Sequence, residues 1–445
     1  MKKKSLRMTA ALLAVITGLV GCGTAPSGTG ENVGDTGNTR TAESGGTPTE
    51  EKPVSGEYPI CYDPAPISGA IEINTASLMS STTDLVDNVS ALYPGENVML
   101  SGLSLNFALA MLSNGAKNEA LTSLENYLGM DVETANAYYA KFMNREKSDT
   151  KNKLMISNAF WTNEQEPFKI RKEYTKTLKD TYLAKVEAIP MNEKGIKKVN
   201  KWADKATDGL IKKALSPNDL TADTQCIIMN ALLFDGKWQS PFETDRTKDV
   251  EFTLADGTVK TVEGMHNEEY FYYENEYATG FRKEYQKGEY YMIAILPKTE
   301  GDFNLTDLDV EGFIASGKST SELNADLNIM LPKTDFERKY DLTDLLKNAG
   351  LAQIFDANSN NFPGIFDTED SNFRSYVSKI IQNDRLIIDE DGTKAAAVTS
   401  IMVDGCMAAF EEKQKLQVYL NRPFALLLMD GATDEPLFVA KIMNP

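Results

Sequence analysis

The sequence contains one histidine, His266, in 445 residues, and this scarcity limits the chemistry open to the chain. A Ser-His-Asp or Cys-His catalytic site would have to use that residue. Its surroundings, residues 264–269, match neither HExxH nor another metal-ligand spacing, so we expect an exposed polar loop residue. G-x-S-x-G, GxxxxGK[ST] and strand-associated GxGxxG motifs are also lacking. We therefore predict no catalytic residue, no metal and no cofactor. A hydrolase that uses carboxylates alone stays open, although no pair stands out among the 65 Asp and Glu.

Cysteine is scarce too, since the chain has four. Cys226 lies in an apolar run and is expected to be a buried thiol. A disulfide between Cys61 and Cys406 stays open for an extracellular chain. Cys22 belongs to a separate N-terminal motif, so three cysteines remain and they cannot all pair. This excludes a disulfide-rich scaffold.

Positive charge is in short supply, with 46 Lys and Arg and a net charge of −19. Binding to nucleic acid depends on Lys and Arg contacts to phosphates. We therefore expect no nucleic-acid partner and no polyanion such as heparin. The acidity indicates a soluble, self-repelling surface.

Residues 1–21 have the composition of a signal peptide. A basic start with Lys2 and Arg7 precedes an apolar run from Met8 to Val20, which is too short to span a bilayer comfortably. The run ends in Leu-Val-Gly before Cys22, which resembles a bacterial lipobox. That resemblance implies cleavage before Cys22, lipidation of its thiol and firm anchoring by two or three acyl chains. We expect a chain anchored on the outer side of a bacterial membrane, in the cell envelope and facing outward.

Residues 22–65 form a stretch rich in Gly, Ser, Thr and Pro, with few large apolar side chains. Such a segment cannot bury a core and is expected to be a disordered tether. Residues 66–445 show no second tether, repeat or later transmembrane run, so we expect one folded domain.

Within that domain, helical patterns dominate the first half and strand patterns the second. Residues 101–115 alternate small and large apolar residues at helical spacing, which indicates a buried helix. Residues 224–234 are nearly all apolar, as in a central strand covered on both faces. A further strand is expected at 373–389. The mixture predicts an α+β fold with large antiparallel sheets.

Several blocks, in order along the chain, resemble motifs of the serpin family. They are Asn97–Ser104, Thr207–Ile211 (T-x-G-x-I), Asn230–Phe242 (N-A-x-x-F-x-G-x-W-x-x-P-F), Asp389–Ala397 ([DE]-E-x-G-T-x-A-A-A), Asn421–Phe424 and Pro436–Phe438 with the last two residues. The resemblance implies a single domain with three β-sheets, about nine helices and an exposed reactive-centre loop at about 390–415. It also implies a suicide mechanism, in which a serine protease forms a covalent acyl complex with the loop and the cleaved loop inserts as a strand. Such a protein is not an enzyme, and we expect a monomer.

The pattern of the loop agrees with insertion. A loop that becomes a buried strand needs small or apolar residues at alternate positions. The odd-numbered residues from Thr393 to Gly405 carry no charge, and both charges, Lys394 and Asp404, fall on the even face. The family motif implies a hinge made of Glu390, Gly392, Thr393, Ala395, Ala396, Ala397 and Thr399.

The expected reactive bond is Cys406–Met407, counted from Gly392 by the family's usual loop length. Because the stretch to Pro423 is longer than in many relatives, Met407–Ala408 and Ala408–Ala409 stay open. Each choice places a small or medium apolar side chain before the bond. This favours elastase-like or subtilisin-like targets over trypsin-like ones.

The resemblance also implies a sheet-opening region made of Ser101, Ser104, Asn230, Trp238 and Gln382. Gln382 stands near the place of a histidine in many members, and Gly102 where proline is usual. The leading hypothesis is inhibition of extracellular serine proteases. The alternative is a non-inhibitory surface binding lipoprotein on the same fold.

Overall fold

The computed structural model describes residues 9–18, 75–144, 152–165, 169–220, 224–368, 370, 372–393 and 413–445. Within these residues the chain forms three β-sheets and eight α-helices, joined by short 3₁₀ turns. The prediction of a single α+β domain with three sheets and about nine helices is therefore confirmed. The predicted signal peptide and tether fall largely outside the described residues.

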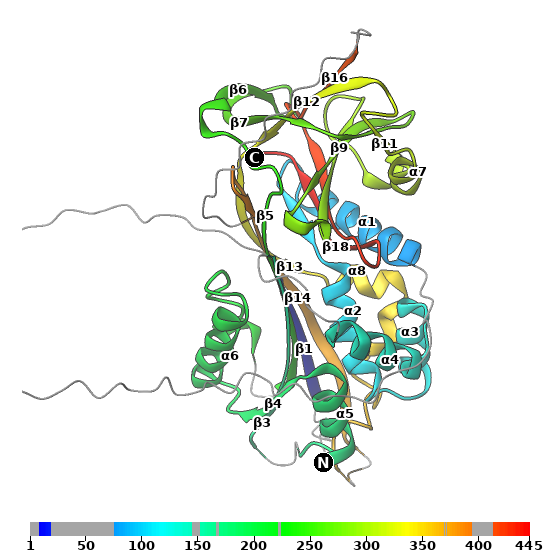
Figure 1. Ribbon diagram of the computed structural model, residues 1–445. Helices are drawn as coiled ribbons and strands as arrows, with labels where there is room; N and C mark the ends of the chain where they lie inside the picture. Colours follow the sequence, from blue (N-terminus) through cyan, green and yellow to red (C-terminus); the bar gives the residue numbers. More distant parts are fainter. Residues whose placement is uncertain are drawn as a thin grey trace, which may run out of the picture.

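The central sheet forms the long axis of the molecule (Figure 1). Its strand order is β13 (Thr334–Asp341), β14 (Arg374–Ile388), β1 (Thr9–Gly18), β5 (Thr224–Lys237), β3 (Lys153–Asn163) and β4 (Lys185–Ile189), with β15 (Gly392–Thr393) paired to β5. Twelve of the 14 residues of β5 are buried, in accord with its apolar sequence.

Strand β1 lies between β14 and β5 and pairs parallel to both. Its residue Ile16 stands opposite Gln382 on one side and Asn230 on the other. A strand was not expected here, because the sequence identifies this run as the core of a signal peptide. A ten-residue apolar run satisfies either pattern, and periodicity alone does not separate them. The sheet thus has room for a strand between β14 and β5.

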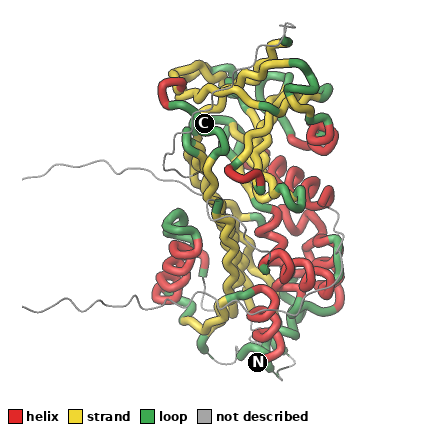
Figure 2. The backbone as a smooth tube through the Cα atoms, viewed as in Figure 1, coloured by secondary structure: helices red, strands yellow, loops and turns green. Residues whose placement is uncertain are grey.

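Helices cover both faces of the central sheet unequally, as Figure 2 shows in red. Helix α6 (Glu193–Ala206) lies alone on one face, and the other face carries most of the helical layer (Figure 1). That layer comprises α1 (Thr75–Leu92), α2 (Gly102–Ser113), α3 (Asn118–Leu128), α4 (Val132–Met143) and α5 (Lys172–Tyr182). All residues of α2 are buried, as expected for a helix that is apolar on every side, and Ser101 caps its first turn.

Two further sheets lie toward one end of the molecule, the upper end in Figure 1. One has the order β11 (Lys318–Ser319), β8 (Phe271–Glu274), β9 (Ala278–Glu284), β10 (Tyr290–Pro297), β17 (Phe424–Asp430), β18 (Glu435–Ile442) and β2 (Val98–Leu100). The other has the order β16 (Gln414–Tyr419), β12 (Ala325–Pro332), β7 (Val259–Glu269) and β6 (Thr247–Thr253). The short helices α7 (Val310–Ala315) and α8 (Thr343–Leu346) complete the described part.

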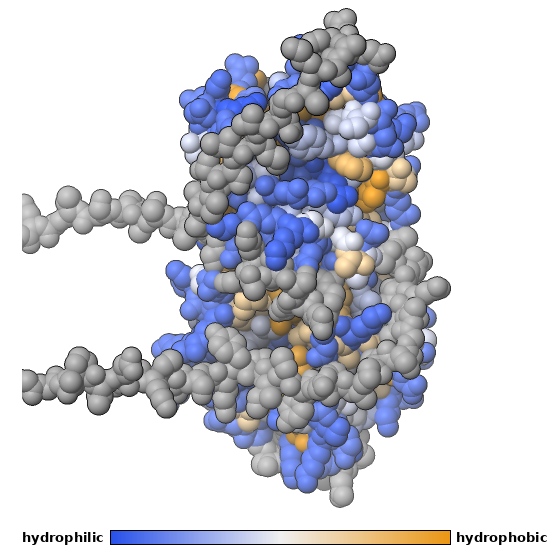
Figure 3. Space-filling view, viewed as in Figure 1, coloured by the Kyte–Doolittle hydropathy of each residue, from blue (hydrophilic) through white to orange (hydrophobic). Residues whose placement is uncertain are grey.

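The described surface is mostly hydrophilic on the face shown in Figure 3. The exposed large apolar side chains are spread over several elements: Leu92, Tyr93, Val259, Tyr270 and Tyr277. Apolar residues scattered in this way are normal for a soluble surface.

Candidate hinge and strand-insertion site

The chain reverses direction directly after β14, at residues 389–392. The side-chain Oδ1 of Asp389 accepts hydrogen bonds from the backbone N–H groups of Asp391 (3.0 Å) and Gly392 (3.1 Å). The Asp389 N–H in turn donates to the carbonyl of Gly392, at 3.1 Å. Burial raises the pKa of Asp389, although these backbone hydrogen bonds oppose the shift. The aspartate therefore builds a tight turn that directs the chain back along the sheet.

Gly392 begins β15, which pairs antiparallel with β5. Gly392 stands opposite Lys237, and Thr393 stands opposite Gly236. A Cβ atom on Gly392 would lie 2.2 Å from the carbonyl oxygen of Gly236. The close approach of two backbones explains why the motif has glycine here.

Thr393 points into the protein rather than toward solvent, with 1% of its surface exposed. Its hydroxyl shares a hydrogen bond of 2.7 Å with the Tyr285 hydroxyl, and the Tyr285 ring stacks on Trp238 at 4.4 Å. Trp238 binds the turn as well, because its Nε1 donates to the carbonyl of Asp389 at 3.0 Å. Its backbone N–H donates to the carbonyl of Asp391 at 3.0 Å. These four contacts thus fix the start of the loop on the sheet.

Glu390 ties the same turn to β6 and to the segment after β12. Its carboxylate lies 2.9 Å from Lys333 Nζ and accepts from the Thr247 hydroxyl at 2.9 Å. Burial would raise the pKa of Glu390, but the hydrogen bonds from Lys333 and Thr247 outweigh it and leave the pKa below its usual range. The Phe242 N–H also donates to the Glu390 carbonyl, at 2.9 Å.

A buried lysine supports the aromatic residues that hold the turn. Lys283 is 1% exposed and forms an ion pair of 2.5 Å with Glu269. Its Nζ donates to the carbonyl of Ser240 at 2.8 Å and lies 4.2 Å from the centre of the Phe242 ring. Burial lowers the pKa of Lys283 and raises that of Glu269, and the attraction between the two charges opposes both shifts. The pair anchors the 238–242 segment.

The predicted sheet-opening residues gather where α2 meets β5. The Ser104 hydroxyl donates to Asn230 Oδ1. Asn230 Nδ2 donates to Asn158 Oδ1 at 2.7 Å, and Asn158 Nδ2 donates to the carbonyl of Tyr182 at 2.8 Å. This chain of bonds links α2, β5, β3 and the end of α5.

Gln382 makes the corresponding link from β14. Its Nε2 contacts the carbonyl of Ser101 at 3.4 Å and Asp384 Oδ1 at 3.3 Å. The structure therefore brings Ser101, Ser104, Asn230 and Gln382 around the first turn of α2, whereas Trp238 lies at the hinge. Their role in sheet opening stays a prediction.

Part of the predicted site falls outside the described residues. This holds for Ala395, Ala396, Ala397 and Thr399 of the hinge, for the expected bond Cys406–Met407 and for Cys22 and Cys61. The described hinge residues are Glu390, Gly392 and Thr393.

The sequence did not identify Tyr285, Asn158, Lys283 or Asp384 as part of this site. One signal was available, because Asp384 follows Gln382 by two residues and therefore shares its strand face. The others reach the site from distant segments, and their contacts follow from the tertiary fold.

His266 differs from the prediction of an exposed loop residue, which was wrong. It lies within β7, opposite Met330, and its half-buried ring meets Tyr419 edge-on at 5.6 Å. Cys226 is a buried free thiol, as predicted.

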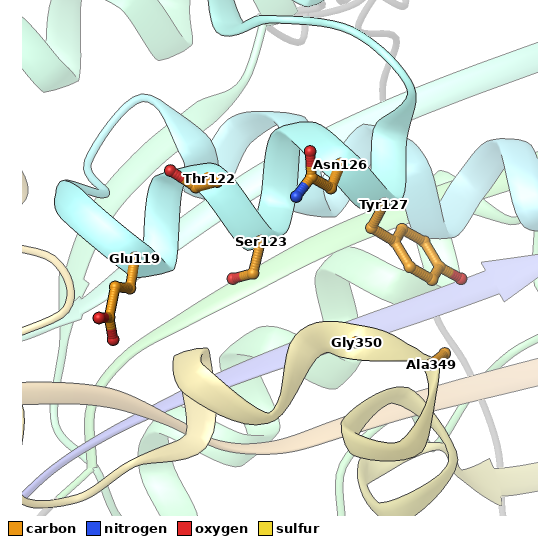
Figure 4. A pocket seen from close by; sticks show the side chains of 7 residues that line it. All are labelled: Glu119, Thr122, Ser123, Asn126, Tyr127, Ala349 and Gly350. Atoms are coloured by element: carbon orange, nitrogen blue, oxygen red, sulfur yellow. The ribbon is translucent and has the colours of Figure 1, made fainter.

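The described residues contain no cluster of His, Cys, Asp or Glu suited to a metal ion. Among them we also find no helix long and apolar enough to cross a membrane. A cavity of about 360 Å³ lies between α3 and the turn at Ala349 and Gly350, lined by Glu119, Thr122, Ser123, Asn126 and Tyr127 (Figure 4). It belongs to the helical layer and not to the boundary of β14 and β5.

Comparison with known proteins agrees with this geometry. Human neuroserpin is 25% identical over 380 residues, which cover 82% of this chain and 90% of that protein. Mouse leukocyte elastase inhibitor A is 26% identical over 377 residues, covering 81% and 97%. The crystal structure of the thermophilic serpin tengpin in its native state has a TM-score of 0.72 and 28% identity, and the match covers 86% of this chain and 97% of that one.

The family model described as Serpin (serine protease inhibitor) matches residues 76–445. This range includes all three sheets apart from β1, and it includes the hinge. The chain therefore belongs to the serpin family of serine protease inhibitors.

Proposed function

We propose that this chain is a suicide-substrate inhibitor of extracellular serine proteases. In this mechanism the target attacks the loop after β15, and the cleaved loop enters the central sheet as a strand between β14 and β5. The observation that carries the proposal is the start of the loop, where β15 already pairs antiparallel with β5 at the edge of that place.

The register on both borders supports insertion in one defined position. Continued along β5 from Gly392 and Lys237, the register brings Thr399 opposite Asn230. Continued along β14 from the Asp389–Gly392 hydrogen bond, it brings Thr399 opposite Gln382. Asn230 and Gln382 are also the two residues that flank one position of β1. The two borders therefore specify the same register for an inserted loop.

The strand position between β14 and β5 would be open to the loop once the signal peptide is cleaved. Strand β1 runs parallel to its neighbours, whereas the loop would enter antiparallel to β14 and β5. Cleavage of the signal peptide, residues 1–21, would remove β1 and free the position between β14 and β5 for the loop. Pairing residues 394–405 with Thr224–Asp235 would add about a dozen backbone hydrogen bonds, on the order of 10 kcal/mol in total.

The side chains of the loop suit this position. Thr393 points into the protein, and residues of the same parity would share its face, among them Ala395, Ala397 and Thr399. None of the odd-numbered residues up to Gly405 is charged. The inward face therefore carries no unpaired charge into the core.

The class of target follows from the residue before the reactive bond. With Cys406–Met407 as the bond, or with Met407–Ala408 or Ala408–Ala409, a small or medium apolar side chain enters the specificity pocket. We propose targets with a shallow apolar pocket, as in elastase-like and subtilisin-like proteases. Lipidation at Cys22 would hold the inhibitor on the outer side of a bacterial membrane, where such proteases arrive.

The test incubates the processed chain, residues 22–445, with elastase, subtilisin and trypsin. We expect complexes resistant to SDS with the first two, and a released C-terminal fragment that begins at Met407. A fragment that begins at Ala408 or Ala409 would move the bond but keep the mechanism. Cleavage by every protease without any complex would contradict inhibition and favour a non-inhibitory binding lipoprotein.

A further inference from the structure

Asp384 is a carboxylic acid inside the central sheet, and no described salt bridge pairs it with a cation. Its side chain is on β14, two residues after Gln382, and it is 0% exposed. One carboxyl oxygen, Oδ1, accepts from Gln382 Nε2 at 3.3 Å. The other, Oδ2, has no hydrogen-bond partner among the described residues, and the same is true of Gln382 Oε1. Two buried acceptors on adjacent side chains are thus left unsatisfied, which is costly.

One hydrogen bond between Asp384 Oδ2 and Gln382 Oε1 would satisfy both oxygens if Oδ2 carried a proton. A primary amide and a neutral carboxylic acid can form a reciprocal pair, in which the amide N–H donates to one carboxyl oxygen and the acid O–H donates to the amide oxygen. The first of these bonds is present, from Gln382 Nε2 to Asp384 Oδ1. The second needs only a proton on Oδ2, and that one proton would satisfy both orphan acceptors.

We propose that Asp384 carries a proton in this structure and closes a reciprocal acid–amide pair with Gln382, which helps to hold β14 on α2. Gln382 reaches α2 through the carbonyl of Ser101, at 3.4 Å. The contact lies where β14 borders the strand position that β1 occupies, since Ile16 stands opposite Gln382.

Groups on the neighbouring strand β13 do not supply a counter-charge. Arg338 stands opposite Asp384 in the register, but its side chain is 44% exposed and its guanidinium pairs with Glu96 at 2.9 Å. Tyr340 stands opposite Gln382, and its hydroxyl donates to the carbonyl of Asn97 at 3.1 Å. Burial raises the pKa of Tyr340, so the phenol stays neutral.

The remaining residues near Asp384 are either uncharged or paired with other carboxylates. On β14 itself, Lys379 lies 3.5 Å from Asp341, and Arg385 lies 3.1 Å from Asp335. Asn97 and Ser101, just before α2, are uncharged, and residues 9–18 contain no titratable side chain. Burial accordingly raises the pKa of Asp384 well above its ordinary value of 3.8, and the Gln382 hydrogen bond opposes the shift only in part.

The direction of the pH effect follows from this raised pKa. Above pH 3.8 the folded chain retains a proton that the unfolded chain has released, so the free energy of unfolding falls as the pH rises toward the folded pKa. One proton changes an unfolding equilibrium or rate by at most about tenfold per pH unit. The folded chain would therefore be more stable in acid and would unfold more readily as the pH rises.

The test measures the rate of unfolding in urea between about pH 5 and 9 for the full-length chain and for Asp384→Asn. An asparagine can donate to Gln382 Oε1 and accept from Nε2 at every pH. We therefore expect the wild-type rate to rise with pH by up to about tenfold per unit more than the rate of D384N. The matched control is D335N on β13, which removes a carboxylate that is 50% exposed and should keep the wild-type slope.

An unchanged slope in D384N would overturn the proposal, and so would a wild-type rate that does not rise with pH. If D384N fails to fold, Asp384→Ala replaces it, because the slope and not the absolute stability is the readout. Other buried acids, such as Glu269 and Asp389, contribute equally to each chain compared. The proposal builds on the proposed function, but the assay contains no protease, so the two can fail separately.

Discussion

At the scale of single residues, the hinge is defined by which side chains point inward. Thr393 is buried against Tyr285, and Trp238 joins that contact to the turn after β14. A residue of the same parity as Thr393 faces the core after insertion, whereas a residue of the opposite parity does not. This difference allows matched variants at adjacent positions.

Thr393→Arg should convert the inhibitor into a substrate. A guanidinium buried on the inward face without a partner costs several kcal/mol, a large part of the roughly 10 kcal/mol expected from insertion. The yield of SDS-resistant complex with elastase should fall to a small fraction of wild type while cleavage continues. The control is Lys394→Arg on the outward face, which should inhibit normally, and equal yields from both variants would refute the assignment of the faces.

Lys283→Met should destabilise the domain by about 3 kcal/mol, because it leaves Glu269 buried without its cation. Urea unfolding gives the value. The double variant K283M/E269Q should recover much of the loss, since no buried charge then remains. A single variant as stable as wild type would show that the ion pair does not support the 238–242 segment.

At the scale of elements, two described residues of β15 pair with β5, and Gly392 makes their close approach possible. Gly392→Ala should separate the two strands, because the new methyl group would meet backbone that cannot move aside. Insertion should slow, and the ratio of cleaved to complexed inhibitor should rise several-fold in a titration against elastase. Gly257→Ala is the control, since that glycine has φ +83° with open space around it and is remote from the hinge in sequence. Equal effects of the two variants would mean that general strain, and not this contact, is responsible.

Elements with a strong local pattern were predictable from the sequence. Helix α2 and strands β5 and β14 were expected close to their observed bounds, since α2 and β5 are apolar over most of their length and β14 ends in the apolar run 386–388. Helices α1 and α4 were missed, because their polar residues dilute the helical periodicity. Strand β1 was missed because an apolar run fits a signal peptide and a strand equally well. The Gln382–Ser101 contact could not be derived either, because it depends on how α2 packs against the sheet.

At the scale of the whole molecule, the proposed lipid and tether would hold the folded domain away from a membrane surface. Cys22→Ser should release the chain, because no acyl group can then be attached and an acyl anchor supplies the affinity. The measurement is labelling with radioactive palmitate in a bacterial host, followed by partition into detergent. Both should be lost in the variant, while complex formation with elastase stays unchanged. A variant that still partitions into detergent would rule out Cys22 as the anchor.

The central claim is that the loop becomes a strand between β14 and β5. The most direct measurement compares the heat unfolding of the intact processed chain with that of the same chain cleaved within the loop. Insertion on the order of 10 kcal/mol should raise the unfolding temperature by roughly 20 °C after cleavage. An unfolding temperature that is unchanged or lower after cleavage would contradict insertion and with it the proposed mechanism.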